Sequence, residues 1–255
     1  MSKKSLTPKG RKSLPTELLQ FGRHLIYSEG IKTEPKYVEN IKKLIASKYN
    51  CKPNDIEIIN ANGDQSYSTI GLVNVMKSDV KKRLKSGENI NHVWVFFDKD
   101  EFEVQAFNEA IFSIENLNDS KDLNDDSFKY NTQDGISYHA CYSNESFELW
   151  LLLYFNYCES KLNRSDYVYK LNEIIKKYDK SMSYEKNANN IHDLLIKCGG
   201  NIENAIKNAN KLTEINGWDN PSTTVYLFAE YFKPYMVKWF IFFLNIIIEK
   251  IKLLW

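Results

Sequence analysis

The first half of the chain alternates short apolar runs with longer segments whose apolar residues recur every three or four positions. The apolar runs have the length of buried strands and cover residues 24–28, 56–59, 93–97 and 136–142. The segments with helical spacing cover residues 37–49, 69–84 and 104–114. Strands that alternate with helices in this order predict an α/β fold, with a parallel sheet flanked by helices.

An acidic, asparagine-rich stretch at residues 116–134 follows the third predicted helix. The stretch is too polar to pack, and we expect it to be a flexible insertion. After the fourth strand the chain is expected to turn at Ser143-Asn144. It would then enter a strongly apolar helix, Phe147–Phe155, which must be mostly buried.

Beyond about residue 160 the sequence predicts only helices. Helical spacing recurs in three segments, residues 168–178, 191–195 and 202–212. Gly199-Gly200 separates the last two of these segments, and Asn220-Pro221 is expected to cap and begin a further helix. The second half of the chain is therefore predicted to be an α-helical region that follows the α/β part.

The length of 255 residues allows one substantial α/β domain with a helical appendage. We divide the chain into a basic N-terminal tail (1–22), an α/β domain (23–158) and a helical region (159–255). The net charge of +1 gives no overall field that would attract a nucleic acid, so a nucleic acid could be bound only by a local group of basic residues. The basic tail is one local candidate, and a merely solvated tail is the alternative.

The last segment of the chain is unusually apolar, because residues 239–248 contain only Asn245 as a polar side chain. This run falls well short of the roughly 20 residues that a membrane-spanning helix needs. We expect a helix that is buried or forms a homo-oligomer, rather than an interfacial membrane helix. The four cysteines are widely spaced and the N-terminus lacks a secretory signal, which together favour a cytoplasmic protein without a membrane span.

Acidic residues follow two of the predicted strands at the same end of the sheet. Glu29 comes after the first strand, and Asp98 and Asp100 come after the third. In an open parallel sheet these strand ends form the crevice in which ligands bind. Three carboxylates in one crevice repel one another unless a cation lies between them, so we predict a Mg²⁺ or Mn²⁺ site. The alternative is that these acids only form solvated turns or helix caps.

Two further glutamates are candidates for the same crevice. Glu34 lies near the start of the helix after the first strand, where it is either a catalytic base or simply favourable against the helix dipole. Glu148 lies in an otherwise apolar helix, where an ionised group needs a partner or a metal, and it is a candidate substrate contact. His139 is predicted to be a packed strand residue rather than a general base.

Four other residues are candidate substrate contacts. Lys32 and Lys99 flank the acids and would meet phosphate, although either is equally well explained as a solvated charge. Ser143 and Asn144 are expected at the same end of a neighbouring strand. Their hydroxyl and amide groups would either cap the next helix, which we favour, or contact the ligand.

Four motifs in order resemble the RloB-like proteins, over roughly residues 23–230. These motifs are Glu29-Gly30-Ile31-Lys32-Thr33-Glu34, Phe97-Asp98-Lys99-Asp100, Ser143-Asn144 leading into Phe147-Glu148-Leu149-Trp150-Leu151-Leu152, and Asn220-Pro221-Ser222-Thr223-Thr224. The Phe-Glu-Leu-Trp-Leu-Leu block is the most specific of them. Two features depart from the family pattern: Glu145-Ser146 stands where proline usually follows Ser-Asn, and the apolar C-terminal segment is additional.

The resemblance implies a Toprim-type fold in which Glu29, Asp98 and Asp100 bind magnesium. Glu29 would either complete the coordination or move a proton, since both tasks need a carboxylate. It also implies an association with antiviral defence and abortive infection, together with an ABC-type ATPase partner. By this analogy the chain is the nuclease half of the pair and cleaves DNA, tRNA or another RNA. The second hypothesis is a non-catalytic regulator that binds a nucleic acid or a phage protein and controls the ATPase.

Overall fold

The computed structural model describes residues 22–49, 52, 54–60, 68–99, 104–119 and 135–236. The basic tail up to residue 21, Asp100, most of the predicted insertion and the C-terminal segment after Met236 lie outside these residues. The predictions that concern those parts therefore stay predictions.

A five-stranded sheet with the order β2-β1-β3-β4-β5 lies at the centre of the fold. The strands are β1 (His24–Ser28), β2 (Ile56–Asn60), β3 (His92–Asp98), β4 (Ser137–Asn144) and β5 (Ser222–Thr223). The first four run parallel, and β5 pairs antiparallel with β4 at one edge. The predicted α/β class and its parallel sheet are confirmed, and the architecture is consistent with a Toprim-type fold.

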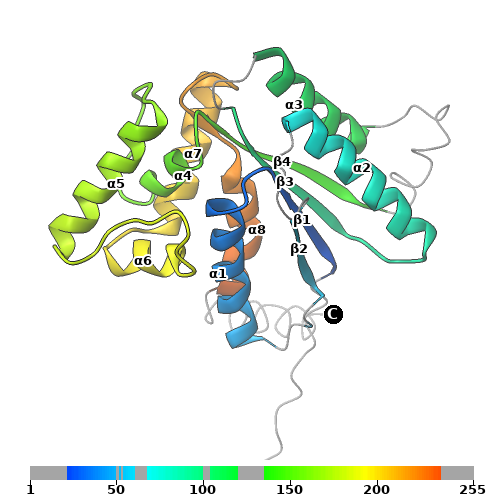
Figure 1. The fold of residues 1–255 in the computed structure, drawn as a ribbon, viewed down its shortest axis with the longest axis horizontal. Helices are drawn as coiled ribbons and strands as arrows, with labels where there is room; N and C mark the ends of the chain where they lie inside the picture. Colours follow the sequence, from blue (N-terminus) through cyan, green and yellow to red (C-terminus); the bar gives the residue numbers. More distant parts are fainter. Residues whose placement is uncertain are drawn as a thin grey trace, which may run out of the picture.

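Helices cover both faces of this sheet (Figure 1). On one face lie α2 (Thr69–Lys85) and α3 (Val104–Asp119), and on the other lie α1 (Thr33–Lys48) and α8 (Val225–Met236). The remaining helices form a group beyond α1: α4 (Glu148–Leu152), α5 (Arg164–Tyr178), α6 (Ile191–Lys197) and α7 (Ile202–Asn216). Gly199 and Gly200 separate α6 from α7, as predicted.

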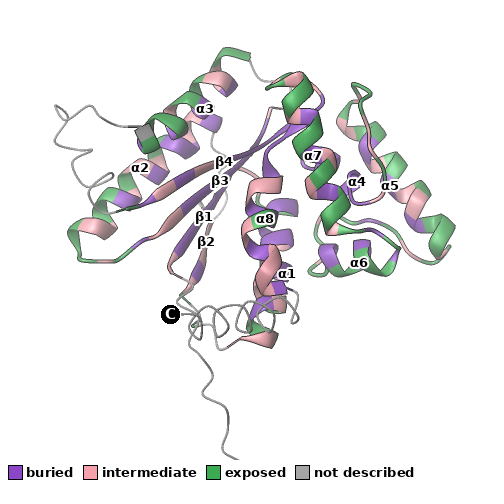
Figure 2. Cartoon of the chain, turned by 180° about the vertical axis from the view of Figure 1, so that it is seen from behind, coloured by how far each residue is buried: buried purple, intermediate pink, exposed green. Residues whose placement is uncertain are grey.

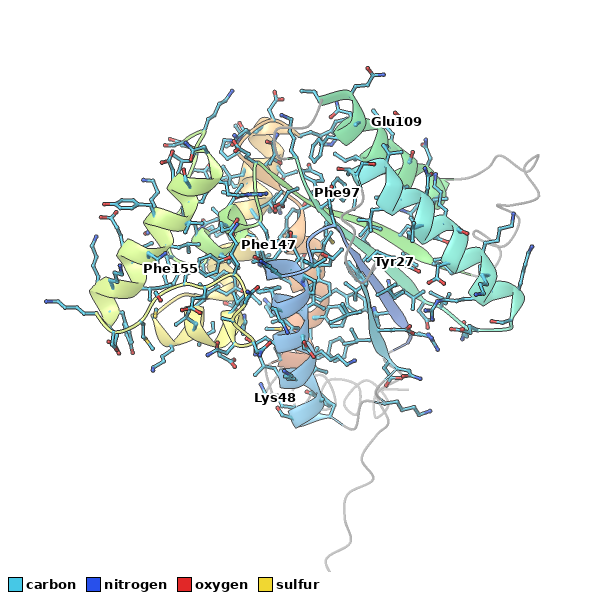
Figure 3. The ribbon with its side chains drawn as sticks, viewed as in Figure 1. Tyr27, Lys48, Phe97, Glu109, Phe147 and Phe155 are labelled. Atoms are coloured by element: carbon cyan, nitrogen blue, oxygen red, sulfur yellow. The ribbon has the colours of Figure 1, made fainter. Side chains whose placement is uncertain are left out.

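β1 and β3 are buried on both faces, which is why their sequences are largely apolar rather than alternating. Tyr27 and Phe97, which Figure 3 labels, belong to the core under α2 and α3. Trp94 and Phe96 belong to the core under α1 and α8. His139 stacks on Trp94 with 3.8 Å between ring centroids, so it is a packed strand residue, as predicted. The helices turn their buried sides to the sheet and their exposed sides outward (Figure 2).

The core on the α1 side also contains residues from the helices after residue 158. Leu171 of α5, Leu212 of α7 and Phe228 of α8 all join it. The predicted division at residue 158 is a boundary in secondary-structure content, and it stays a prediction as a domain boundary. Among the described residues, no helix is both long and apolar enough to cross a membrane.

The third helix is longer than predicted, since α3 continues to Asp119 and includes the first residues of the expected insertion. Asn118 explains the difference. Its side-chain amide donates to the carbonyl of Tyr138, and its side-chain oxygen accepts from the backbone N–H of Tyr138, each at 2.8 Å. Leu117 is also buried, so this last turn is tied to β4 despite its polar sequence.

Four expectations around β4 and β5 were wrong. The strand β4 does not turn at Ser143-Asn144 but includes both residues, because they pair with Thr223 and Ser222 of β5. The helix that follows is correspondingly short, and the chain leaves it in turns after Leu152, although the segment is buried as expected. Strands also do not disappear after residue 160.

Asn220-Pro221 does not begin a helix, which was the fourth error. It precedes β5, an edge position where proline is tolerated because no ladder hydrogen bond needs its missing N–H. The amide of Asn216 donates to the Pro221 carbonyl at 2.8 Å and holds the turn. The helix α8 starts only at Val225.

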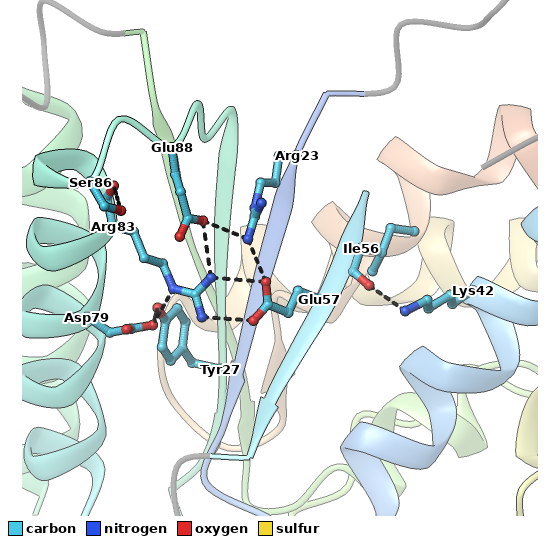
Figure 4. A network of polar contacts seen from close by, with 9 residues as sticks. All are labelled: Arg23, Tyr27, Lys42, Ile56, Glu57, Asp79, Arg83, Ser86 and Glu88. Carbon is cyan, nitrogen blue, oxygen red and sulfur yellow. Dashed lines mark hydrogen bonds and ion pairs between the residues drawn. The ribbon is translucent and has the colours of Figure 1, made fainter. Parts of the chain in front are cut away.

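A network of ion pairs joins β2, α2 and the residue before β1 (Figure 4). Arg83 binds both carboxylate oxygens of Glu57, at 2.8 and 3.0 Å, and its Nε binds Asp79 at 2.8 Å. Arg23 binds Glu57 and Glu88, each at 2.7 Å. The main cause of the lowered pKa of Glu57 is its hydrogen bonding with Arg83, and burial acts in the opposite direction by raising the pKa. Networks with bidentate geometry contribute more than isolated surface pairs.

We expect Arg83→Met to lower the free energy of unfolding by about 1–2 kcal/mol at neutral pH, a value discounted for the partial exposure of the network. The neighbouring exposed Lys82→Met is the matched control. Folding lowers the pKa of Glu57 below its ordinary value of 4.5. The ionised Glu57 therefore stabilises the folded state above about pH 4.5, and this stabilisation is lost as the pH falls further. Urea unfolding should therefore show the wild-type advantage shrinking in acid. If the difference in unfolding free energy between wild type and Arg83→Met is the same at neutral and at acidic pH, this account is wrong.

Candidate functional site

Glu29 lies directly after β1, at the carboxyl end of the sheet. Its backbone N–H donates to the carbonyl of Phe96 at 2.9 Å, which holds it against β3. Its carboxylate accepts a hydrogen bond from the hydroxyl of Thr69, the first residue of α2, at 3.2 Å. A helix N-terminus favours a carboxylate through its free N–H groups and the helix dipole. Glu29 is therefore held on the α2 side of the strand end.

Asp98 is the last residue of β3 and is buried, with 8% of its surface exposed. Its Oδ2 accepts a hydrogen bond from Nη2 of Arg164 at 3.0 Å. Arg164 is the first residue of α5, and its side chain is 39% exposed. This pair connects the end of the sheet to the helical group on the α1 side.

Glu34 lies in the first turn of α1 and is buried beneath the backbone of Gly30. A Cβ at Gly30 would lie 2.7 Å from the carboxyl carbon of Glu34, so only glycine allows this approach. Burial, first of all, and the negative charge of Glu148 raise the pKa of Glu34 to about 7, against the opposing effect of its backbone hydrogen bond, Arg164 and Lys186. Near neutral pH this carboxyl group therefore exists in both protonation states.

Glu148, the first residue of α4, has 2% of its surface exposed. Its Oε1 accepts a hydrogen bond from the hydroxyl of Tyr184 at 3.0 Å and forms an ion pair with Lys186 at 3.2 Å. The expectation that this buried charge needs a partner is confirmed, and the partners come from the loop between α5 and α6.

The acids thus lie around the ends of β1 and β3, which are direct neighbours in the sheet although β2 lies between them in the sequence. Glu34, Asp98 and Glu148 are linked through Arg164 and Lys186 on the α1 side, while Glu29 contacts α2 on the other side. Asp100, the third predicted metal ligand, lies outside the described residues. Within the described ranges, no three His, Cys, Asp or Glu side chains are grouped as a metal site, so the predicted site stays a prediction.

The four predicted substrate contacts have different surroundings. Lys32 is exposed next to α1, and Lys99 lines a cavity together with Asn144. The hydroxyl of Ser143 shares a hydrogen bond with that of Thr223 at 3.0 Å. The amide of Asn144 donates to the Trp218 carbonyl at 2.8 Å. Ser143 and Asn144 therefore join β4 to its neighbours and do not cap the next helix, which corrects the capping expectation.

Sequence reasoning missed Thr69, Arg164, Tyr184 and Lys186. Arg164 carried a usable signal, because a cation at the first position of a helix is disfavoured by the helix dipole and needs an acidic partner elsewhere. Thr69 was recognised only as part of an amphipathic helix. Tyr184 and Lys186 lie in a loop without a pattern, and only the folded chain brings them to Glu148.

A sequence model of the RloB-like protein family matches residues 24–231. The chain belongs to the RloB-like protein family. The match begins at β1 and ends within α8, so it includes every site residue described above. Neither the curated proteins nor the solved structures compared with this RloB-like chain contain a match.

The raised pKa of Glu34 predicts how the stability of this RloB-like protein depends on pH. The pKa of Glu34 is 4.5 in the unfolded chain and about 7 in the folded protein. The protonated carboxyl group therefore stabilises the folded state fully below about pH 4.5, and this stabilisation is lost as the pH rises through about 7. Glu34→Gln should remove that loss. Relative to wild type, the variant should gain about 1–3 kcal/mol of unfolding free energy between about pH 5 and pH 8.

Denaturant unfolding at several pH values measures this effect. Glu39→Gln, on the same helix and 44% exposed, is the matched control and should follow the wild-type curve. If Glu34→Gln and wild type run parallel from pH 5 to pH 8, Glu34 is ionised throughout and the argument from burial is wrong.

Proposed function

We propose that this RloB-like protein is a magnesium-dependent Toprim-type nuclease that cleaves phosphodiester bonds in DNA or RNA. The observation that carries the proposal is the placement of Glu29 and Asp98 at the adjacent ends of β1 and β3, where Asp98 also pairs with the partly exposed Arg164. Carboxylates at the carboxyl ends of neighbouring parallel strands lie where open α/β sheets bind their ligands. Their hard oxygen atoms suit Mg²⁺ or Mn²⁺.

Glu29, Asp98 and Asp100 would hold the metal, and the bound ion would stabilise negative charge on the phosphate oxygens. Other residues of the chain are suited to bind the substrate phosphate and to transfer a proton. The half-exposed guanidinium of Arg164 is available to a substrate phosphate, for which its planar fork is suited. Glu34, with a pKa of about 7, is suited to take up or release a proton.

The biological setting that we propose is an antiviral defence system of the abortive-infection type, in which an ABC-type ATPase controls the nuclease. Support for this setting is the family membership together with the resemblance of the four motifs. An uncontrolled nuclease would damage its own cell, so a controlling partner is consistent with the chemistry proposed for the site.

A second candidate function is a non-catalytic regulator of the ATPase that binds a nucleic acid or a phage protein. The observation that favours it is the Arg164–Asp98 ion pair, because a guanidinium already neutralises the first acid of the Asp98-Lys99-Asp100 segment. Metal-dependent cleavage of purified nucleic acid separates the two candidates.

For the nuclease, we expect Mg²⁺ or Mn²⁺ at about 100 times its dissociation constant to add roughly 2.7 kcal/mol to the stability of the full-length wild type. Asp98→Asn should abolish cleavage and shrink this gain, since the shape is kept and the charge is lost. Asp166→Asn, exposed in the first turn of α5, is the matched control and should retain both properties. Melting curves with chelator and with metal, combined with cleavage assays, measure both. A wild type that neither cleaves nor responds to metal would favour the regulator.

A separate variant tests the role of Arg164. If its guanidinium binds the substrate phosphate, Arg164→Ala should lower the cleavage rate about 100- to 1,000-fold, as measured when one positioned donor is removed from an active site. The gain in melting temperature on adding metal should persist, because the carboxylates are unchanged. Lys177→Ala, exposed on the same helix, is the control. Loss of the metal response in Arg164→Ala would instead assign Arg164 a purely structural role.

A further inference from the structure

A cavity of about 480 Å³ lies beside Lys99, between α3 and the turn that precedes β5. Small-molecule sites typically have volumes of about 300–1,000 Å³, so this cavity has room for a ligand of nucleotide size. Lys99 directly follows Asp98, and Asn144 directly follows Ser143, which pairs with Asp98 in the sheet. The cavity therefore adjoins the candidate active site at the end of β3 and β4.

Aromatic rings form part of the cavity wall and are held in place by neighbouring rings. Trp218 packs edge-on against Phe112 of α3, with 4.8 Å between ring centroids and 81° between ring planes. Phe107 of α3 packs against Phe97 and Tyr142. Rings that are fixed before a ligand arrives lose little conformational entropy on binding, which favours stacking with a flat partner.

The turn that carries Trp218 is also fixed by hydrogen bonds. The amide of Asn144 donates to the Trp218 carbonyl, and the amide of Asn216 donates to the Pro221 carbonyl, each at 2.8 Å. The hydroxyl of Ser222 donates to the Gly217 carbonyl. Both ends of the turn are therefore tied to the sheet and to α7, so the cavity is preformed.

The polar groups of the cavity suit a nucleobase better than a bare anion. Four asparagines, Asn108, Asn144, Asn216 and Asn220, line the wall. A carboxamide has a donor and an acceptor for the edge of a base, although the amides of Asn144 and Asn216 already donate to backbone carbonyls. The Oδ1 of Asn220, a residue that also lines the cavity, is buried and lacks a hydrogen-bond partner among the described residues. Asp219 also lines the cavity, and its charge disfavours a phosphate lodged on its own.

The cavity is also lined by two cationic residues, Lys99 and Lys161. Lysines next to an aromatic wall supply the phosphate contact that accompanies base stacking in nucleic-acid binding. The combination of fixed rings, carboxamides and lysines matches a base with its attached phosphate.

We propose that this cavity binds one unstacked nucleotide of the nucleic acid held at the active site, with its base against Trp218. This inference rests on the proposed nuclease function and specifies the substrate class. A base inside a duplex is stacked and paired and cannot enter such a cavity. The substrate is therefore a single strand, or a nucleotide that has been flipped out of a duplex.

The test measures binding rather than cleavage, so it is independent of the nuclease chemistry. Full-length protein in chelator is titrated against a short end-labelled single strand of DNA or RNA, followed by fluorescence anisotropy. The bases are then removed one at a time by abasic substitution. One position should bind roughly 5- to 100-fold more weakly, which is the range for stacking of a base on an aromatic side chain.

Trp218→Ala should weaken binding of the intact strand by the same factor and should lose the sensitivity to the abasic position. Trp218→Phe keeps a flat ring and should retain that sensitivity. Asn108→Ala should weaken binding several-fold, whereas Asn210→Ala, exposed on α7 away from the cavity wall, should not. Melting curves verify that each variant is folded.

Several results would overturn the inference. These are equal binding of all abasic strands, no binding of any single strand, tighter binding of an intact duplex, and free mononucleotides that bind as tightly as the strand. The last result would assign the cavity to a free nucleotide. Failure of the nuclease proposal is distinguishable, because it would abolish metal-dependent cleavage while the position-dependent binding in chelator persisted.

Discussion

The pairing of β3 with both β1 and β4 is the interaction on which the rest of the structure depends. β3 is buried on both faces and carries Trp94 into one core and Phe97 into the other. Its register with β4 sets Asp98 opposite Ser143, and its register with β1 brings Glu29 to the carbonyl of Phe96. A slip of one residue would exchange the two faces of the strand and place Asp98 in an apolar core. The apolar packing of the sheet therefore also determines the position of the acids.

The electrostatics of the site follow from burial at that strand end. Desolvation of buried carboxyl groups costs free energy unless cations or hydrogen bonds stabilise their charge. Asp98 and Glu148 each have a cation within 3.2 Å, whereas Glu34 lies next to a like charge and has a raised pKa. Two of the three acids therefore each form an ion pair, and the third is left able to change protonation near neutral pH. This division resembles the separation of roles that acid–base chemistry requires.

The sequence predicted most of the strands and helices, because their apolar periodicity reflects burial that each element shows on its own. It failed where pairing depends on distant residues. Ser143 and Asn144 look like a turn, and Asn220-Pro221 looks like a helix start, until β5 pairs with β4. Glu148 was found because an acid in an apolar helix is conspicuous, and Glu34 was found from its place near the start of the helix after the first strand. Tyr184 and Lys186 gave no such signal, since a loop position acquires its partner only in the folded chain.

The edge strand β5 connects the candidate active site at the end of β3 with the cavity beside Lys99. By extending β4 through Asn144, it keeps the carboxyl end of the sheet ordered beyond Asp98, and the turn before it supplies Trp218. The acids need buried, charge-paired surroundings, whereas a nucleobase needs an open cavity with rings and amides. A parallel sheet alone would end in loops at this point. The short antiparallel pair allows both environments to exist one residue apart, because Asp98 faces Arg164 while Lys99 lines the cavity.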